Sequence, residues 1–134
     1  MADAVILIID DMPERHNLII KWLKFHKGFP SSHIVSAYEY EEAVRTLDTI
    51  HEHCIHIFLD HDFDLIMHDP DDEKTGTDIA RHMVDMGYDI PTTVISINPS
   101  GADRIYHILN DAGVAVSKKP IFQFTFEMED NLDD

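Results

Sequence analysis

Apolar residues along the chain follow two different patterns, which predict alternating strands and helices. Short apolar runs, rich in β-branched residues where they are best defined, occur at residues 4–9, 33–36, 55–59, 92–97 and 114–117. The first of them, "AVILII", is unbroken by polar residues, as is typical of a strand buried on both faces of a parallel sheet. Between the runs, apolar residues recur three or four positions apart over residues 13–27, 38–53, 75–87 and 101–113, which predicts amphipathic helices.

This alternation predicts the fold class. Strands that alternate with single helices favour an α/β fold with right-handed crossovers between parallel strands. We expect a flavodoxin-like, doubly wound parallel sheet of about five strands in the order 2-1-3-4-5. In such a sheet the carboxyl ends of the first and third strands are neighbours, and ligands bind there.

The end of the chain shows a different pattern. After Pro120, the segment "IFQFTFEMEDNLDD" places Phe122, Phe124 and Phe126 at every second position before it becomes acidic. A period of two is typical of an extended strand. We therefore expect a domain over residues 1–120, followed by an extended tail over 121–134 in place of a last helix. Such a tail could pack on its own domain or form a homodimer by pairing with a second copy.

Composition narrows the functions. The 134 residues carry 26 acidic and 10 basic side chains, for a formal net charge of −16. This charge argues against a protein that coats nucleic acid, although it leaves open the grip of a single RNA end through metal ions. Cys54 is the single cysteine, and neither a targeting segment nor an apolar run of membrane-spanning length stands out. We therefore expect a cytoplasmic domain that does not bind membranes.

Carboxylates gather where the predicted strands end. Asp10 and Asp11 follow the first strand and Asp60 follows the third, so the strand order would bring the three together. Because like charges repel, such a group favours a bound cation, and all-oxygen ligands suit Mg²⁺ or Mn²⁺. The alternative is that each carboxylate only solvates the end of its own strand.

Polar residues at the neighbouring strand ends suggest a phosphate site. Ser96 offers a hydroxyl, Asn98 an amide and Lys119 a positive charge, all suited to phosphate oxygens. Asn98 could instead simply cap the helix that follows it. Next to Asp60, His61 or Asp62 could orient a water molecule. In an extended segment, alternation would place Asp62 on the side of Asp60 and His61 on the other.

These residues resemble the receiver domain of two-component response regulators over residues 4–120. The matching features are the Asp10–Asp11 pair, Asp60, Ser96, and Lys119 followed by Pro120. The resemblance implies that Asp60 accepts a phosphoryl group and that the acidic pair holds Mg²⁺. It further implies that Ser96 and Lys119 contact the phosphoryl oxygens.

Three further motifs are similar to the cyclic-phosphate-processing receiver-like domains. They are "LDHD" at 59–62, "TGTDIA" at 75–80 and "NPSG" at 98–101. This resemblance implies hydrolysis of cyclic phosphate ends, of RNA or of a nucleotide, by a metal-dependent phosphoesterase. The family pattern has a histidine where this chain has Ile95, which favours slow or absent catalysis.

Three functions therefore stay open: a cyclic phosphoesterase, a stand-alone receiver phosphorylated on Asp60, and an inactive binding module. The partner would be a phosphate-containing small molecule, an RNA end or another protein. The loop from Phe63 to Lys74, which contains His68, is of a kind that is often a lid, and two arrangements stay open: it closes over the site or it lies beside it.

Overall fold

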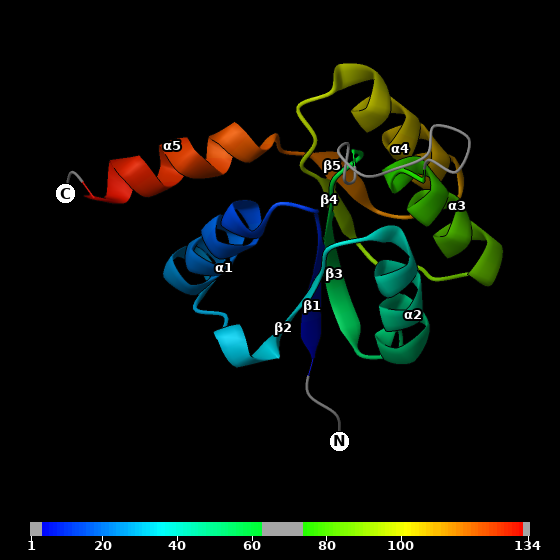
Figure 1. The fold of residues 1–134 in the computed structure, drawn as a ribbon, viewed down its shortest axis with the longest axis horizontal. Helices are drawn as coiled ribbons and strands as arrows, with labels where there is room; N and C mark the ends of the chain where they lie inside the picture. The colour runs from blue at the N-terminus through cyan, green and yellow to red at the C-terminus, as the bar shows by residue number, and fades with distance from the viewer. Residues whose placement is uncertain (1–3, 63–73, 133–134) are drawn as a thin grey trace.

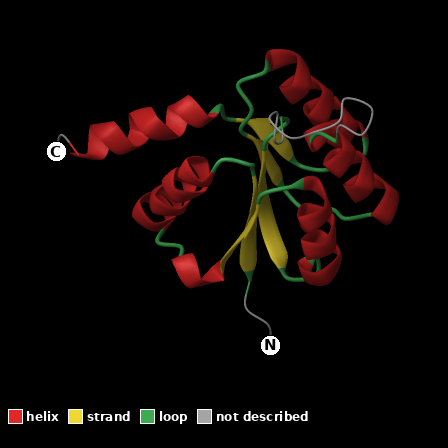
Figure 2. Cartoon of the chain, viewed as in Figure 1, coloured by secondary structure: helices red, strands yellow, loops and turns green. Residues whose placement is uncertain are grey.

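The chain folds into a parallel sheet with helices on both faces (Figures 1 and 2). The structure, a computed structural model, describes residues 4–62 and 74–132. The strands are β1 (Val5–Ile9), β2 (Ile34–Ala37), β3 (Cys54–Leu59), β4 (Thr92–Val94) and β5 (Val116–Lys118). The helices are α1 (Pro13–Lys27), α2 (Tyr40–Ile50), α3 (Gly76–Met86), α4 (Pro99–Asp111) and α5 (Ile121–Leu132), with a 3-10 turn, η1, at Ser31–His33.

The five strands run in the order β2-β1-β3-β4-β5, and each neighbouring pair is parallel. The predicted fold class and strand order are therefore confirmed. In the register of the central pair, Ile9 of β1 lies beside Leu59 of β3. The residues that follow these two positions consequently leave the sheet side by side.

Alternation along the strands divides the core between two faces. Leu7 and Ile9 pack in a cluster with residues of α2, α3 and α4, whereas Ile6 and Ile8 pack with residues of α1 and α5. The two groups of helices lie on opposite sides of the sheet in Figure 1. Since β1 is buried on both sides, an unbroken apolar run is what its position requires.

Helix ends lie close to where the sequence predicts them. α1 begins at Pro13 and ends before Gly28, which has a left-handed backbone with φ of 63°, the conformation that glycine adopts most easily. Thr75 caps α3: its hydroxyl accepts from the Thr77 amide, while the Asp78 carboxylate accepts from the Thr75 amide. The capping box thereby fixes the start of α3 beside the end of β3.

The expected extended tail is wrong, because residues 121–132 form the helix α5. Residues at every second position also contain pairs four apart, which share one side of a helix. Phe124 is fully buried and packs edge to face on Trp22 of α1, with ring centroids 5.0 Å apart. Phe122 and Phe126 form a second, exposed pair on α5. The phenylalanines at every second position therefore lie on two different sides of α5, one buried and one exposed.

Two further expectations concern other parts of the chain. Residues 63–73, which contain His68 and most of the candidate lid, lie outside the described residues. No helix in residues 4–62 and 74–132 is both long and apolar enough to cross a membrane.

Candidate functional site

The structure brings Asp10, Asp11 and Asp60 together at the carboxyl end of the sheet. Each offers a carboxylate oxygen, and the three oxygens lie within 4.8 Å of one another. The backbone explains the placement, since the Asp60 amide donates to the Ile9 carbonyl at 2.9 Å and so holds the end of β3 against the end of β1. The strand order thus creates the predicted cluster.

Two of these carboxylates are buried. The exposed fraction is 0% for Asp10 and 2% for Asp60. Burial raises the pKa of Asp10 to about 6. Burial also raises the pKa of Asp60 to about 7, with a further contribution from the nearby charge of Asp10. A buried carboxylate is costly as an anion unless a cation compensates it, so this pair favours positive charge between its oxygens.

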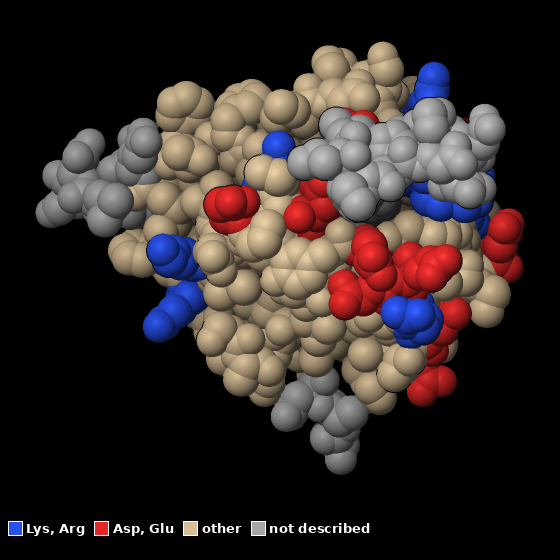
Figure 3. All heavy atoms as spheres, in the orientation of Figure 1, with Lys and Arg blue, Asp and Glu red and all other residues tan. Residues whose placement is uncertain are grey.

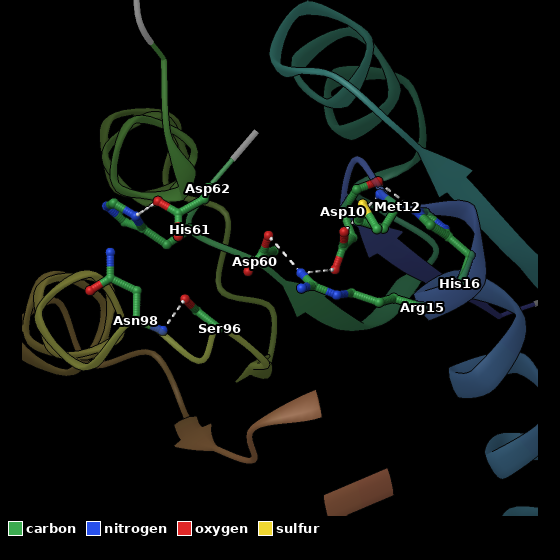
Figure 4. A network of polar contacts seen from close by, with 9 residues as sticks. All are labelled: Asp10, Met12, Arg15, His16, Asp60, His61, Asp62, Ser96 and Asn98. Atoms are coloured by element: carbon green, nitrogen blue, oxygen red, sulfur yellow. Dashed lines mark hydrogen bonds and ion pairs between the residues drawn. The ribbon is translucent and has the colours of Figure 1, made fainter. Parts of the chain in front are cut away.

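Arg15 supplies part of that charge. Its Nη1 atom lies 3.4 Å from Asp10 Oδ2 and 3.4 Å from Asp60 Oδ2, so one guanidinium group bridges the two strand ends (Figure 4). Arg15 is a site residue that the sequence did not indicate, since a single arginine in the first turn of α1 belongs to no motif. The one indication in the sequence is the position of Arg15, about one helical turn after Asp10 and Asp11. Both contacts are long for charged hydrogen bonds, which leaves the carboxylates incompletely compensated.

His16 forms a hydrogen bond with the backbone of Asp10. Its Nε2 atom lies 2.6 Å from the Asp10 carbonyl oxygen, which can only accept, so Nε2 carries the proton. Its Nδ1 atom lies 2.9 Å from Ser36 Oγ of β2, and burial lowers the pKa of this histidine. The Met12 amide donates to Asp10 Oδ1 at 2.9 Å. Asp10 is therefore fixed at both its backbone and its side chain, as a metal ligand should be.

His61 and Asp62 form a pair beside Asp60. His61 Nδ1 lies 2.8 Å from Asp62 Oδ1, and Figure 4 shows the Asp62 carboxylate turned to the imidazole ring. β3 ends at Leu59 and the chain bends at His61, so the expected strand alternation does not extend to this pair. His61 is 8% exposed, and its Nε2 atom is buried with no hydrogen-bond partner. Figure 4 shows Nε2 on the side of the ring away from Asp60, so His61 contacts the site through Nδ1 and Asp62.

Two glycines let helices α3 and α4 approach the site closely. A Cβ atom on Gly76 would lie 2.2 Å from the Asp60 carbonyl oxygen, and one on Gly101 would lie 2.3 Å from Cγ of His61. The Gly76 amide donates to the His61 carbonyl at 2.8 Å. The glycines of "TGTDIA" and "NPSG" therefore have a steric role, because a side chain at either position would collide with the site.

Ser96 and Asn98 lie between β4, which ends at Val94, and α4, which begins at Pro99. Ser96 is buried, and its Oγ accepts from the Asn98 amide at 3.0 Å. Asn98 Oδ1 accepts from the Gly101 amide at 3.2 Å, as the N-cap of α4. Asn98 is therefore the N-cap of α4, as in the second alternative that the sequence left open. Figure 4 places Ser96 and Asn98 on the other side of Asp60 from Arg15.

The structure does not bring Lys119 to this group. Its ammonium group lies 2.6 Å from Glu127 Oε2 of α5 and 4.1 Å from the centre of the Trp22 ring. These contacts attach Lys119 to the interface of α1 and α5. Ile95, at the family's histidine position, is fully buried in the core cluster with Phe58 and Phe124. On this backbone, position 95 contributes to packing.

The three histidines His51, His53 and His56 are near one another in the sequence but separate in the structure. His51 stacks on Tyr88, His53 is exposed, and His56 Nε2 lies 2.7 Å from Thr93 Oγ1.

Comparison with solved structures places this fold among receiver domains. A signal receiver domain of a putative LuxO repressor protein from Vibrio parahaemolyticus matches with a TM-score of 0.61 and 14% identity, over 98% of this chain and 92% of the other. The bacteriophytochrome response regulator AtBRR matches with a TM-score of 0.61 and 19% identity, over 99% and 94%. FixJ-N matches with a TM-score of 0.54 and 20% identity, over 90% and 84%. At these identities the likeness shows the fold.

The sequence itself identifies the family. Residues 5–111 match the model of the cyclic-phosphate processing receiver domain, and this match includes the acidic cluster, His61, Ser96 and the two glycines. The chain belongs to this family of receiver-like domains. No curated protein matches the chain in sequence.

Proposed function

We propose that this domain binds a divalent cation at its three strand-end carboxylates and uses the site to bind and hydrolyse a cyclic phosphate ester. The observation that carries the proposal is the meeting of Asp10, Asp11 and Asp60 within 4.8 Å, with two of them buried. A carboxylate set of this kind fits Mg²⁺ or Mn²⁺, since hard cations prefer oxygen ligands. When bound, such an ion would act as a Lewis acid on a phosphate oxygen.

The protein groups beside the cluster suit the remaining chemistry. Hydrolysis adds the oxygen of water to phosphorus and breaks one ring P–O bond; the leaving oxygen takes up a proton, which gives a phosphate monoester with a free hydroxyl group. The Asp62 carboxylate, which accepts from His61 Nδ1, would take the proton from the attacking water. The His61 ring would hold Asp62 in place, since its Nε2 atom is buried and faces away from Asp60 (Figure 4). Arg15 contacts Asp10 and Asp60. From this position its guanidinium group would also form an ion pair with a phosphate oxygen. The Ser96 hydroxyl would donate to a phosphate oxygen.

A second candidate function rests on the fold of the receiver-domain neighbours. In this alternative, Asp60 attacks a phosphodonor and becomes an acyl phosphate, and the protein signals through changed surface contacts. The two functions use the same cation site. They differ in the part of Asp62, which the first requires and the second does not.

The variant Asp62→Asn separates these functions. We expect it to lower hydrolysis of a 2′,3′-cyclic nucleotide by roughly 10- to 100-fold, because the amide oxygen can still accept from His61 Nδ1 but the amide cannot take a proton from water. The measurement is ³¹P NMR with Mg²⁺ or Mn²⁺, run beside acetyl phosphate, with Glu52→Gln, an exposed position, as the control. Unchanged cyclic-phosphate turnover in Asp62→Asn would refute the role of the His61–Asp62 pair. An acyl phosphate that Asp60→Asn removes, without any turnover, would favour the signalling function.

A further inference from the structure

The sheet face beneath α5 contains an open apolar hollow. The hollow has a volume of about 320 Å³, and its walls include Ile6, Trp22, Leu23, Phe29 and Phe58. It remains open because α5 leaves the sheet at its first residue and points away from it (Figure 1). Among the side chains of α5 that the structure describes, Phe124 is fully buried. A sheet face of this composition is normally covered, since exposed apolar surface is unfavourable in water.

α5 carries an apolar surface that is also uncovered. Phe122 is 50% exposed and Phe126 is 61% exposed. The two residues are four positions apart on the helix, and their rings lie edge to face with centroids 6.3 Å apart. They therefore form one continuous apolar surface. The open hollow and the exposed pair are therefore two complementary apolar surfaces on one chain.

Helix α1 and the end of α5 carry side chains of opposite charge. Lys21, Lys24 and Lys27 lie on the exposed side of α1, and none has a carboxylate within 4.0 Å among the described residues. Figure 3 shows basic side chains over α1, on the left of the face drawn. The sequence after Phe126, "EMEDNLDD", contains four acids besides Glu127, which contacts Lys119 and Trp22 of its own chain. A basic α1 with an apolar hollow would therefore attract an acidic helix that carries phenylalanines.

We propose that α5 of a second copy of this chain docks in the hollow between α1 and the sheet, and that the contact is reciprocal in a symmetric dimer. The last segment of this chain has the chemistry that the hollow requires, an exposed phenylalanine pair followed by acids. A two-fold axis would form the same contact twice. Each phenylalanine presents roughly 100 Å², and with the walls of both hollows the buried area would be on the order of 1,000 Å². We therefore expect a dimer with a dissociation constant in the micromolar range.

Sedimentation equilibrium of the full chain tests the dimer. We expect a concentration-dependent dimer held mainly by the phenylalanine contact, because each copy carries a net charge of −16 and salt screens that repulsion as well as the lysine–acid attraction. The variant Phe126→Ser should weaken association by at least about tenfold. Met86→Ser, which removes a residue of α3 that is 53% exposed, is the matched control and should leave association unchanged. Circular dichroism checks that the variants are folded.

A complementation experiment tests which surfaces meet. Ser117→Arg places a long charged side chain at the edge of the hollow, which Ser117 lines from β5, and should also abolish the dimer. Phe126→Ser keeps an intact hollow, and Ser117→Arg keeps an intact α5. A mixture of the two variants can therefore form one of the two contacts and should associate more strongly than either variant alone.

Three results would overturn the proposal. The first is a wild-type chain that stays monomeric up to a few hundred micromolar, about a hundredfold above the dissociation constant expected for such an interface. The second is Met86→Ser weakening the dimer as much as Phe126→Ser, which would indicate general adhesion. The third is a mixture that associates no better than its components, which would leave the hollow free for an acidic helix of another protein.

Discussion

The variant Asp60→Asn should stabilise the metal-free protein at pH 8 while it removes the function of the site. The pKa of the Asp60 carboxyl group is about 7 in the folded protein, against a reference value of 3.8. Ionising it inside the fold is therefore unfavourable, and an uncharged amide of the same shape avoids this. The expected gain in the free energy of unfolding at pH 8 is on the order of a few kcal/mol.

The sign follows from proton binding. Between pH 4 and pH 7 the folded wild-type protein binds more protons at Asp60 than the unfolded chain, so its stability falls as the pH rises through this interval. The advantage of Asp60→Asn should therefore be greatest above pH 7 and should decrease steadily as the pH falls toward 4. Urea denaturation in EDTA at several pH values measures it. The half-exposed Asp11→Asn serves as the control, with a smaller expected change.

Either of two results would contradict this account of Asp60. A variant less stable than wild type at pH 8 would mean that the charged form of Asp60 stabilises the fold. A stability difference that does not vary with pH would mean that the effect comes from packing and not from the buried charge.

The variant Gly76→Ala should destabilise the protein by about 3 kcal/mol. Its Cβ atom would lie 2.2 Å from the Asp60 carbonyl oxygen and 2.8 Å from Cδ1 of Ile105. Because the first contact is with backbone, relief requires α3 to move away from β3. The helix propensity of alanine exceeds that of glycine by only about 1 kcal/mol, which is too little to compensate.

Thermal and urea unfolding of Gly76→Ala measure the loss, with Asp85→Ala on the exposed side of α3 as the control that should lose no stability. Gly101→Ala offers a comparison, since its new Cβ atom would lie 2.3 Å from Cγ of the buried His61 ring. The ring would have to move, so we expect a loss of stability and a weaker His61–Asp62 contact. Equal stability of Gly76→Ala and wild type would show that α3 is not held against Asp60.

The sequence was sufficient for the sheet and for the acidic cluster, for a common reason. Buried parallel strands need continuous apolar runs such as "AVILII", and their ends are marked by the first charged residues. Once the strand order is known, Asp10 and Asp60 must be neighbours. The capping residue Thr75 and the stop at Gly87 were likewise local signals, fixed by hydrogen bonds within a few residues.

The features that the sequence did not predict depend on contacts between distant parts of the chain. Arg15 contacts Asp60, 45 residues away, and nothing near Arg15 announces this. Lys119 lies on Glu127 and Trp22 because α5 turns toward α1, whereas a strand-end lysine considered alone suggests the phosphate site. The Phe rows of α5 were ambiguous between a period of two and pairs four apart. The packing of Phe124 on Trp22 and Phe58 is consistent with the helix.

The most direct test of the central claim is to titrate the wild-type protein with Mn²⁺ at pH 8 and to count the bound ions by electron paramagnetic resonance. The carboxylates of Asp10, Asp11 and Asp60 predict one bound Mn²⁺ per chain, displaced by excess Mg²⁺. The affinity should fall by at least about tenfold in Asp10→Asn, which keeps the shape of the site and removes one charged ligand. Stoichiometric binding that Asp10→Asn leaves unchanged, or no binding by the wild type, would contradict a cation site at the ends of β1 and β3.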